Sequence, residues 1–112
     1  MKIAERIIKD VNGLDMYMLT SDSKSGIQDN FVLLLHGFPE LSYSFRHLIH
    51  GLSKKGIYCI APDQRGYGQT VFINKKKEQK LKRFSVINLV KDIDILLKKL
   101  NINKVNIVGH DF

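Results

Sequence analysis

An aspartate stands on a predicted sharp turn near the end of the 112-residue sequence. The apolar run Val105–Val108 is typical of a buried strand, and Gly109 interrupts it where the chain must turn. The sequence His110-Asp111-Phe112 then places a carboxylate at the corner. A carboxylate at such a corner can act as a nucleophile and form an ester that water cleaves. It can equally cap the following helix, and this motif alone does not choose between the two roles.

Two further motifs follow apolar runs upstream of this turn. The run Phe31–Leu35 leads into His36-Gly37-Phe38-Pro39-Glu40, and the run Ile57–Ala61 leads into Pro62-Asp63-Gln64-Arg65-Gly66-Tyr67-Gly68. Apolar runs of this length are typical of parallel strands that are covered on both faces. Ligands of parallel α/β sheets bind at the C-terminal ends of the strands. We therefore expect the three motifs to meet at one edge of a sheet.

An opening hairpin is predicted ahead of these strands. Residues Ala4–Val11 and Leu14–Thr20 flank Asn12-Gly13, a dipeptide that tolerates the positive φ angles of a type I′ turn. At positions 14–18 apolar residues alternate with more polar ones, which predicts a strand with one buried face. The segment 21–30 is rich in Ser, Asp and Gly and is predicted to be a loop.

Two helices are predicted from apolar residues at helical spacing. The first would have Ser42 or Ser44 as its N-cap and would end at Lys54-Lys55-Gly56. Four residues form its apolar face: Phe45, Leu48, Ile49 and Leu52. The second would follow a solvated lysine-rich loop, with Ser85 as its N-cap and its end at 101–103. Seven residues form its apolar face: Val86, Leu89, Val90, Ile93, Leu96, Leu97 and Leu100.

This order of elements predicts an α/β fold in which a β-hairpin precedes a parallel β-α-β-α-β unit. The sequence is 44% hydrophobic and 26% charged, as is ordinary for a globular domain, and it contains no internal repeat. We therefore expect residues 1–112 to belong to one domain.

The charge and the single cysteine narrow the function classes. The net charge is +7, but the lysines gather at helix ends and in one connecting segment that lacks interleaved aromatic residues. The hypothesis that the protein binds nucleic acid is therefore supported by its net charge alone. Cys59 lies in an apolar run and is expected to be a small buried hydrophobe. No apolar run is long enough to span a membrane and residues 1–10 lack a signal-peptide core, so we expect a cytoplasmic protein.

The three motifs together resemble those of α/β-hydrolases, and more narrowly those of the epoxide hydrolases that use an aspartate nucleophile. They occur in that family's order and at about its usual separation: His36-Gly37-Phe38-Pro39-Glu40, Asp63-Gln64-Arg65-Gly66-Tyr67-Gly68 and Gly109-His110-Asp111. The resemblance covers essentially the whole sequence, but only the first half of the family's catalytic domain. It implies that the complete enzyme uses water to open a small apolar epoxide to a diol, without a metal or cofactor.

The resemblance also implies roles for individual residues. Asp111 would be the nucleophile, and the backbone N–H groups of Phe38 and Phe112 would form the oxyanion hole. Pro39 resembles a family proline whose preceding bond is cis, which would aim the Phe38 amide inward. Six other motif residues would have structural roles: His36, Gly37, Asp63, Arg65, Gly109 and His110. Asp63 and Arg65 would hold their loop in place by hydrogen bonds and charge pairing.

Two alternatives to this reading stay open. Dehalogenases of the same fold have similar motifs, but they carry Trp or Arg after the nucleophile, whereas Phe112 has no side-chain donor. The catalytic histidine, its acid and the lid tyrosines of the family would lie beyond Phe112, so these 112 residues alone are expected to be an inactive fragment. The strand Val105–Val108 would then be an exposed apolar edge that invites aggregation.

Overall fold

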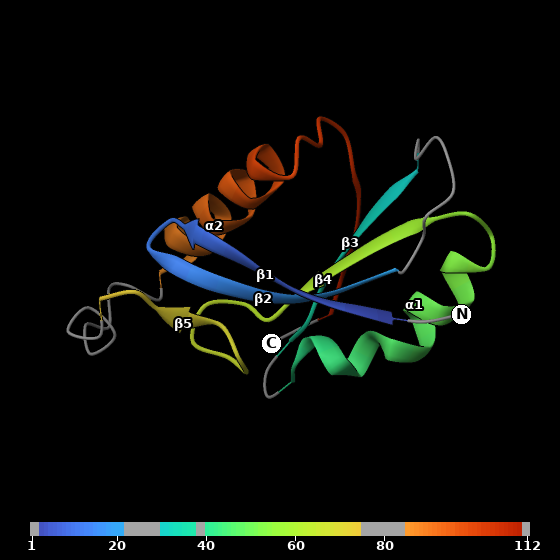
Figure 1. Ribbon diagram of the computed structural model, residues 1–112, viewed down its shortest axis with the longest axis horizontal. Helices are drawn as coiled ribbons and strands as arrows, with labels where there is room; N and C mark the ends of the chain where they lie inside the picture. Colours follow the sequence, from blue (N-terminus) through green and yellow to red (C-terminus); the bar gives the residue numbers. More distant parts are fainter. Residues whose placement is uncertain (1–2, 22–29, 38–39, 75–84, 111–112) are drawn as a thin grey trace.

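A six-stranded mixed sheet organises the chain in the computed structural model, which describes residues 3–21, 30–37, 40–74 and 85–110 (Figure 1). The strands are β1 (Ile3–Val11), β2 (Leu14–Ser21), β3 (Phe31–Leu35), β4 (Tyr58–Pro62), β5 (Val71–Phe72) and β6 (Asn106–Gly109). Their order in space is β1-β2-β4-β3-β6, and the short β5 pairs with β2. Strands β3, β4 and β6 are parallel to one another, whereas β2 pairs antiparallel with both β1 and β4. The predicted hairpin and parallel unit are thus confirmed as parts of one sheet.

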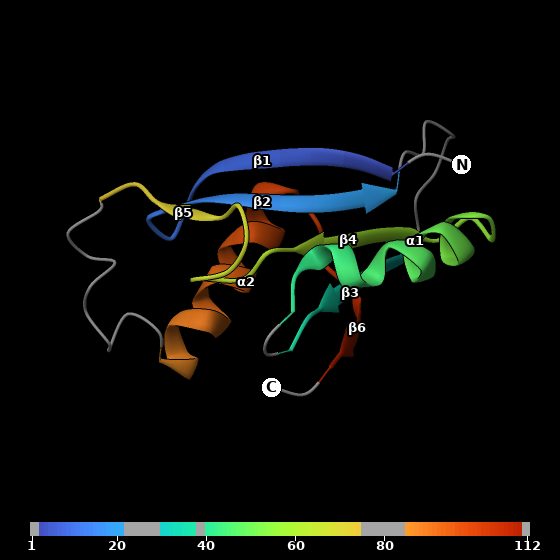
Figure 2. The same ribbon diagram turned by 90° about the horizontal axis from the view of Figure 1, so that it is seen from below.

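The two long helices cover opposite faces of this sheet. Helix α1 (Arg46–Ser53) connects β3 to its neighbour β4, and α2 (Val86–Lys99) lies between β4 and β6 in the chain. The connection from β4 through α2 passes β3 and reaches β6 at the edge of the sheet. The two connections thus run in opposite directions across the sheet. Because crossovers of parallel strands are right-handed, their helices lie on different faces. The buried residue Ile49 of α1 and the buried residue Leu96 of α2 accordingly belong to two separate core clusters. Figure 2 shows the strong twist between the β1–β2 hairpin and β6.

The opening hairpin forms at the predicted turn. Asn12 and Gly13 both have positive φ angles, 53° and 82°, as a type I′ turn requires. The pairing of β1 with β2 shifts register between Ile8 and Val11, where Asp10 also has a positive φ of 53°. This irregularity was not predicted, because its signal is one aspartate within a run of otherwise ordinary strand residues.

The prediction that β2 has only one buried face was wrong. Leu14, Met16 and Met18 belong to the core cluster on the α2 side, whereas Tyr17 and Leu19 belong to the cluster on the α1 side. The strand is buried on both faces because it lies inside the sheet, between β1 and β4, with a helix on each side. Its pairing extends to Ser21, which was predicted to begin a loop. Residues 22–29 of that loop lie outside the described residues.

Helix α1 begins differently from the prediction. A short 3₁₀ helix, η1 (Ser42–Phe45), precedes it, and neither N-cap position is occupied by a serine whose side chain caps the helix. The Ser42 N–H instead donates to the Asp63 carboxylate at 2.8 Å, so a distant side chain satisfies this amide. The predicted C-terminus is confirmed, because Gly56 has a φ of 80° and the Ile57 N–H donates to the Leu52 carbonyl.

Helix α2 has the predicted cap, but only part of its predicted apolar face is covered. The Ser85 hydroxyl accepts a hydrogen bond from the Asn88 N–H, which confirms the N-cap. Leu96 is fully buried, whereas Val86 and Val90 are 73% and 62% exposed. The buried polar residue Asp92 shows which side of the helix faces the sheet. The lysine-rich loop predicted ahead of α2 lies largely outside the described residues.

In the part of the chain that the structure describes, none of the helices has the length and apolar character that a membrane span requires.

Strand β6 forms an open apolar edge, as expected for the 112-residue chain. Among the described strands it pairs only with β3. All four of its residues are exposed, and Ile107 and Val108 are 62% and 41% exposed. Its bounds, Asn106–Gly109, differ by one residue from the predicted Val105–Val108. The opposite edge strand, β1, carries charged side chains on most of its exposed positions, which protect an edge against further pairing.

We predict that a polypeptide of these 112 residues self-associates through β6. Ile107→Lys should shift it toward the monomer, because a charged side chain on an open edge opposes pairing with a second edge. Sedimentation velocity over a concentration series measures this shift. Ile7→Lys on β1 is the matched control, since Ile7 is 56% exposed on the other edge. An equal shift in both variants would contradict a specific role for β6.

Candidate active site

The three motifs identified in the sequence meet at the C-terminal edge of the parallel strands. The His110 N–H donates to the carbonyl of Leu35 at 3.0 Å, which joins the ends of β6 and β3. The Gln64 N–H donates to the His36 ring at 2.9 Å, which joins the segments after β4 and β3. The predicted meeting is therefore confirmed for the described residues. Phe38, Pro39, Asp111 and Phe112 lie outside them, so their predicted roles stay predictions.

His36 uses both ring nitrogens in the protein interior. Its side chain is fully buried, and its Nε2 accepts the hydrogen bond from the Gln64 N–H. The proton of the neutral ring therefore lies on Nδ1, which is 3.0 Å from the Gly37 carbonyl oxygen and donates to it. The ring also makes an edge contact with Tyr67 at 4.9 Å between centroids. Because neither nitrogen is left to accept a proton from water, this geometry suits a structural role.

Gln64 was not singled out in the sequence, but its side chain is part of the same arrangement. It is 6% exposed, and its Nε2 donates to the His36 carbonyl oxygen at 2.7 Å. The signal available in the sequence was a long uncharged amide directly after a buried strand. An amide in such a place needs partners, but its partner cannot be read from spacing alone.

Asp63 links the loop after β4 to the start of η1. Its Oδ1 accepts from the Ser42 N–H at 2.8 Å, and its Oδ2 accepts from the Gln69 N–H at 3.0 Å. The carboxylate is nearly fully buried and sits against Gly68, whose φ is 53°. Hydrogen bonds from two backbone amides offset the free-energy cost of burying this carboxylate away from water.

Gly68→Ala is predicted to destabilise the protein more than Gly13→Ala does. Both glycines have positive φ, so alanine should cost about 1–2 kcal/mol at either position. At Gly68 a Cβ would also clash with the Asp63 carboxylate, whereas at Gly13 it would meet nothing within 4 Å. Displacing the carboxylate should add about 2 kcal/mol, because hydrogen bonds to a charged group are lost. Urea unfolding of both variants measures the difference, and equal midpoints would show that Asp63 adapts freely.

Arg65 forms a buried ion pair with α2. Its Nε and Nη2 donate to the two oxygens of Asp92 at 2.8 and 2.7 Å, and the two side chains are 3% and 2% exposed. The Asn12 side chain donates to the same carboxylate at 2.9 Å, and the Arg65 Nη2 donates to the Asn12 carbonyl. The sequence predicts that Arg65 forms a charge pair, and the structure identifies Asp92 as its partner. Asp92 is not part of the predicted apolar face of α2, so its burial could not be predicted from the apolar periodicity of the helix.

Glu40 connects the segment after β3 to the segment after β6. Its Oε1 lies 2.8 Å from the His110 Nδ1 and accepts a longer bond, 3.4 Å, from the Gly37 N–H. The Glu40 N–H donates to the Gly37 carbonyl at 3.0 Å. The His110 side chain is 62% exposed, so this contact lies at the surface of the sheet edge. The contact therefore links the residues that flank Phe38 in the sequence to the residue that precedes Asp111.

Other titratable groups are poor nucleophiles in this environment. Burial raises the pKa of the Cys59 thiol, which the Ser21 hydroxyl lowers only in part. Burial, followed by the hydrogen bond to Glu5, raises the pKa of Tyr17 to about 12. Both groups therefore stay protonated near neutral pH. The predicted role of Cys59 as a buried hydrophobe is confirmed.

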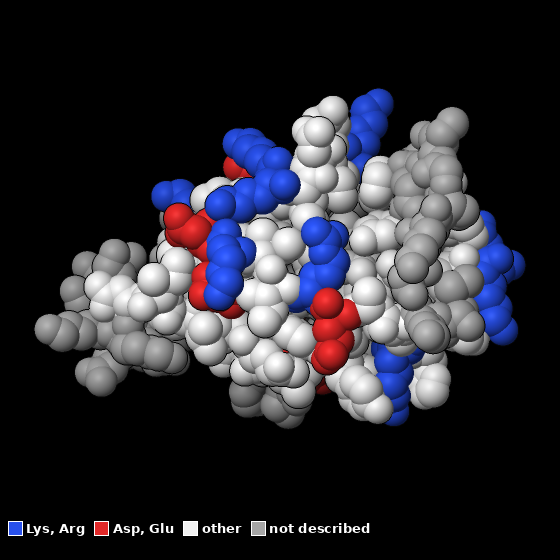
Figure 3. Space-filling view, viewed as in Figure 1, with Lys and Arg blue, Asp and Glu red and all other residues white. Residues whose placement is uncertain are grey.

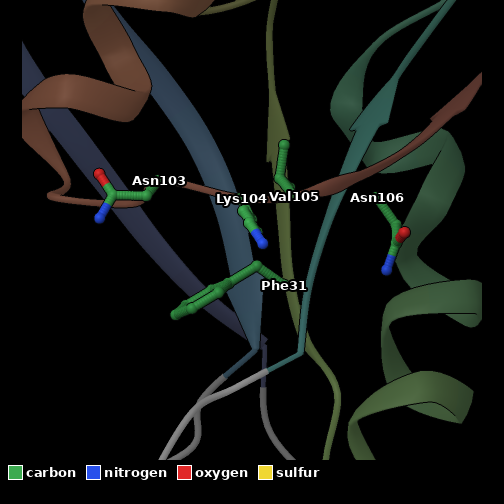
Figure 4. A pocket seen from close by; sticks show the side chains of 5 residues that line it. All are labelled: Phe31, Asn103, Lys104, Val105 and Asn106. Atoms are coloured by element: carbon green, nitrogen blue, oxygen red, sulfur yellow. The ribbon is translucent and has the colours of Figure 1, made fainter.

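A cavity of about 560 Å³ lies at the ends of the parallel strands that are opposite to the three motifs (Figure 4). Phe31 and Asn106 begin β3 and β6, so their positions place this cavity at the N-terminal ends of the strands. It is not the place where the three motifs meet. The candidate site therefore lies at the opposite, C-terminal ends of the strands.

Basic and acidic side chains are interspersed on part of the described surface. On the face shown in Figure 3, Lys and Arg side chains form separate groups with acidic side chains between several of them. Some basic side chains are used in ion pairs, such as Lys98 with Asp94 and Lys9 with Asp15. Within the described ranges, no cluster of His, Cys, Asp or Glu could hold a metal ion.

Comparisons with known proteins agree with the motifs. Residues 30–112 match the family described as alpha/beta hydrolase fold. The chain is 39% identical over 108 residues to epoxide hydrolase 3 of Siraitia grosvenorii, covering 96% of this chain and 31% of that protein. It is 33% identical to epoxide hydrolase A of Mycobacterium tuberculosis, again covering 96% of this chain and 31% of the relative.

A solved structure gives the same result in three dimensions. The crystal structure of the epoxide hydrolase VrEH1 from Vigna radiata superposes with a TM-score of 0.82 at 38% identity, covering 97% of this chain and 31% of that one. The chain thus spans about a third of the length of the relatives it matches.

Proposed function

Because the chain belongs to the alpha/beta hydrolase fold family, we propose that its protein is an epoxide hydrolase that converts an epoxide and water to a vicinal diol. One observation carries this proposal: three motifs from distant parts of the chain meet at the edge of the sheet where such folds bind ligands. The similarity to epoxide hydrolases over nearly the whole chain supports the same reaction. Residues 1–112 would be the N-terminal part of one catalytic domain, acting in the cytoplasm.

In the proposed reaction, Asp111 is the nucleophile of a nucleophile elbow. Its carboxylate attacks a ring carbon, the carbon–oxygen bond of the epoxide breaks, and the released alkoxide takes a proton. Water then attacks the carbonyl carbon of the resulting ester, which gives a tetrahedral oxyanion and finally the diol and free Asp111. The groups that donate the proton and activate the water belong, in this proposal, to parts of the fold outside these residues.

The backbone N–H groups of Phe38 and Phe112 form the proposed oxyanion hole, where they stabilise the tetrahedral intermediate. The described neighbours of these residues support the assignment. His36 and Gly37 precede Phe38, and both take part in hydrogen bonds at the C-terminal edge. His110, which precedes Asp111, is bound to the end of β3 through its backbone and to Glu40 through its ring.

The experiment that tests the proposal is an assay of the protein expressed from its complete reading frame. Epoxides of different size and polarity are incubated with it, and diols are separated and quantified. Diol formation that depends on enzyme concentration is the expected result. Release of halide from haloalkanes or haloacids in the absence of diol would instead identify a dehalogenase. No product from either panel would overturn the proposal.

A further inference from the structure

We propose that Gln64 is a positioning residue for the oxyanion hole, acting through the backbone of the segment that precedes Phe38. This inference rests on the proposed function, in which the Phe38 amide stabilises the tetrahedral intermediate. Gln64 itself would touch neither the substrate nor the intermediate. Its effect would come from holding His36, two residues before Phe38, by two hydrogen bonds.

The two bonds fix different parts of His36. The Gln64 backbone N–H donates to the His36 Nε2 at 2.9 Å, which fixes the tautomer and orientation of the ring. The Gln64 side chain donates to the His36 carbonyl oxygen at 2.7 Å, which fixes the peptide unit between His36 and Gly37. The N–H of that same peptide unit lies 3.4 Å from the Glu40 carboxylate. The peptide unit is therefore held from both sides.

The next peptide unit carries the amide of the proposed oxyanion hole. Its carbonyl, on Gly37, accepts from the His36 Nδ1 and from the Glu40 N–H, each at 3.0 Å. A peptide unit is planar, so the direction of its carbonyl governs the direction of its amide. The ring that Gln64 orients thus donates to the carbonyl that shares a plane with the functional amide.

The far end of the same segment is held by the residue next to Gln64. The Asp63 carboxylate accepts from the Ser42 N–H, shortly after the segment ends. Adjacent residues after β4 therefore anchor both ends of the segment 37–41. The His36 carbonyl can only accept a hydrogen bond, and the Gln64 side chain supplies the donor.

Gln64→Met tests the inference because methionine has similar length and no donor, while the backbone bond to the ring remains. The oxyanion forms during hydrolysis of the ester and not during attack on the epoxide. We expect the single-turnover rate constant for ester hydrolysis to fall about tenfold while that for ester formation stays the same. Accordingly kcat and KM should fall together with kcat/KM unchanged, and the aspartyl ester should accumulate in mass spectra of quenched enzyme.

Gln69→Met is the control, since Gln69 lies exposed on the same loop and its side-chain amide bonds to Tyr17 and not to His36. Its backbone N–H, which donates to Asp63, is kept in this variant. Rate constants are normalised to the amplitude of the first turnover, so a loss of folded protein does not imitate a slower step. If Gln64→Met does not fold, Gln64→Asn shortens the same amide by one methylene and gives the same comparison.

Two results would overturn the inference while leaving the proposed function intact. One is wild-type rate constants in the variant, and the other is an equal fall in ester formation and hydrolysis, which a general structural defect would cause. Absence of diol formation by the unmodified protein would overturn the proposed function itself, and the inference with it.

Discussion

Asp111→Ala is expected to lower the rate of diol formation by at least about a thousandfold, because alanine cannot form the ester on which the proposed reaction depends. The variant should bind substrate and remain folded, since the change removes only a carboxylate at a turn that the sequence predicts. The measurement is a steady-state assay of the protein from its complete reading frame. Mass spectrometry of quenched samples should find an adduct of one substrate molecule in the wild type and none in the variant.

Asp94→Ala is the matched control for this change. Asp94 is an exposed aspartate on α2, with 59% of its side chain accessible, and it pairs only with Lys98 in the described contacts. Its replacement should leave the rate of diol formation unchanged. If Asp111→Ala retained an appreciable rate and still formed an adduct, another residue would be the nucleophile and Asp111 would be a helix cap.

Asp92→Ala should have the largest effect on stability, lowering the free energy of unfolding by about 3–5 kcal/mol. The change leaves the Arg65 guanidinium buried without its partner and removes the acceptor of the Asn12 amide. Urea or guanidinium unfolding, followed by circular dichroism, measures the loss. Asp94→Ala again provides the comparison, since an exposed ion pair on the same helix contributes at most about 1 kcal/mol.

A double variant separates pairing from burial at this position. Arg65→Met with Asp92→Leu removes both charges and keeps apolar volume, so it should recover much of the stability lost in Asp92→Ala. A double variant as unstable as the single one would indicate that the hydrogen bonds to Asn12, and not the unpaired charge, dominate the loss.

Local signals in the sequence were sufficient to predict the hairpin, the three parallel strands, the two longer helices and the order of the motifs. The Asn12-Gly13 turn, the Ser85 cap and the C-terminus of α1 at Gly56 each depend on a few neighbouring residues, and each is confirmed. The parallel strands could be predicted because their continuous apolar runs end in motifs of recognisable order. The convergence of the motifs then follows from strand direction alone.

Contacts between distant polar residues could not be predicted in the same way. The Asp63 carboxylate replaces a serine cap at Ser42, and Arg65 pairs with Asp92 across the fold. The sequence predicts that Asp63 and Arg65 form hydrogen bonds and charge pairs, but it does not identify Ser42 and Asp92 as their partners. The choice of partner depends on which segments the sheet brings together. The two-residue strand β5 is too short for any periodicity to indicate it.

The burial of β2 on both faces has a consequence for synthesis on the ribosome. The hairpin is encoded by a local turn and can pair as soon as its residues leave the exit tunnel, well before β4 has been made. Until β4 and the two helices arrive, the apolar side chains on both faces of β2 face water or whatever else binds them. The Asn12 amide finds its carboxylate partner only 80 residues later, when α2 docks. The nascent hairpin thus exposes apolar side chains on both faces until the rest of the sheet has formed, and such exposure promotes aggregation.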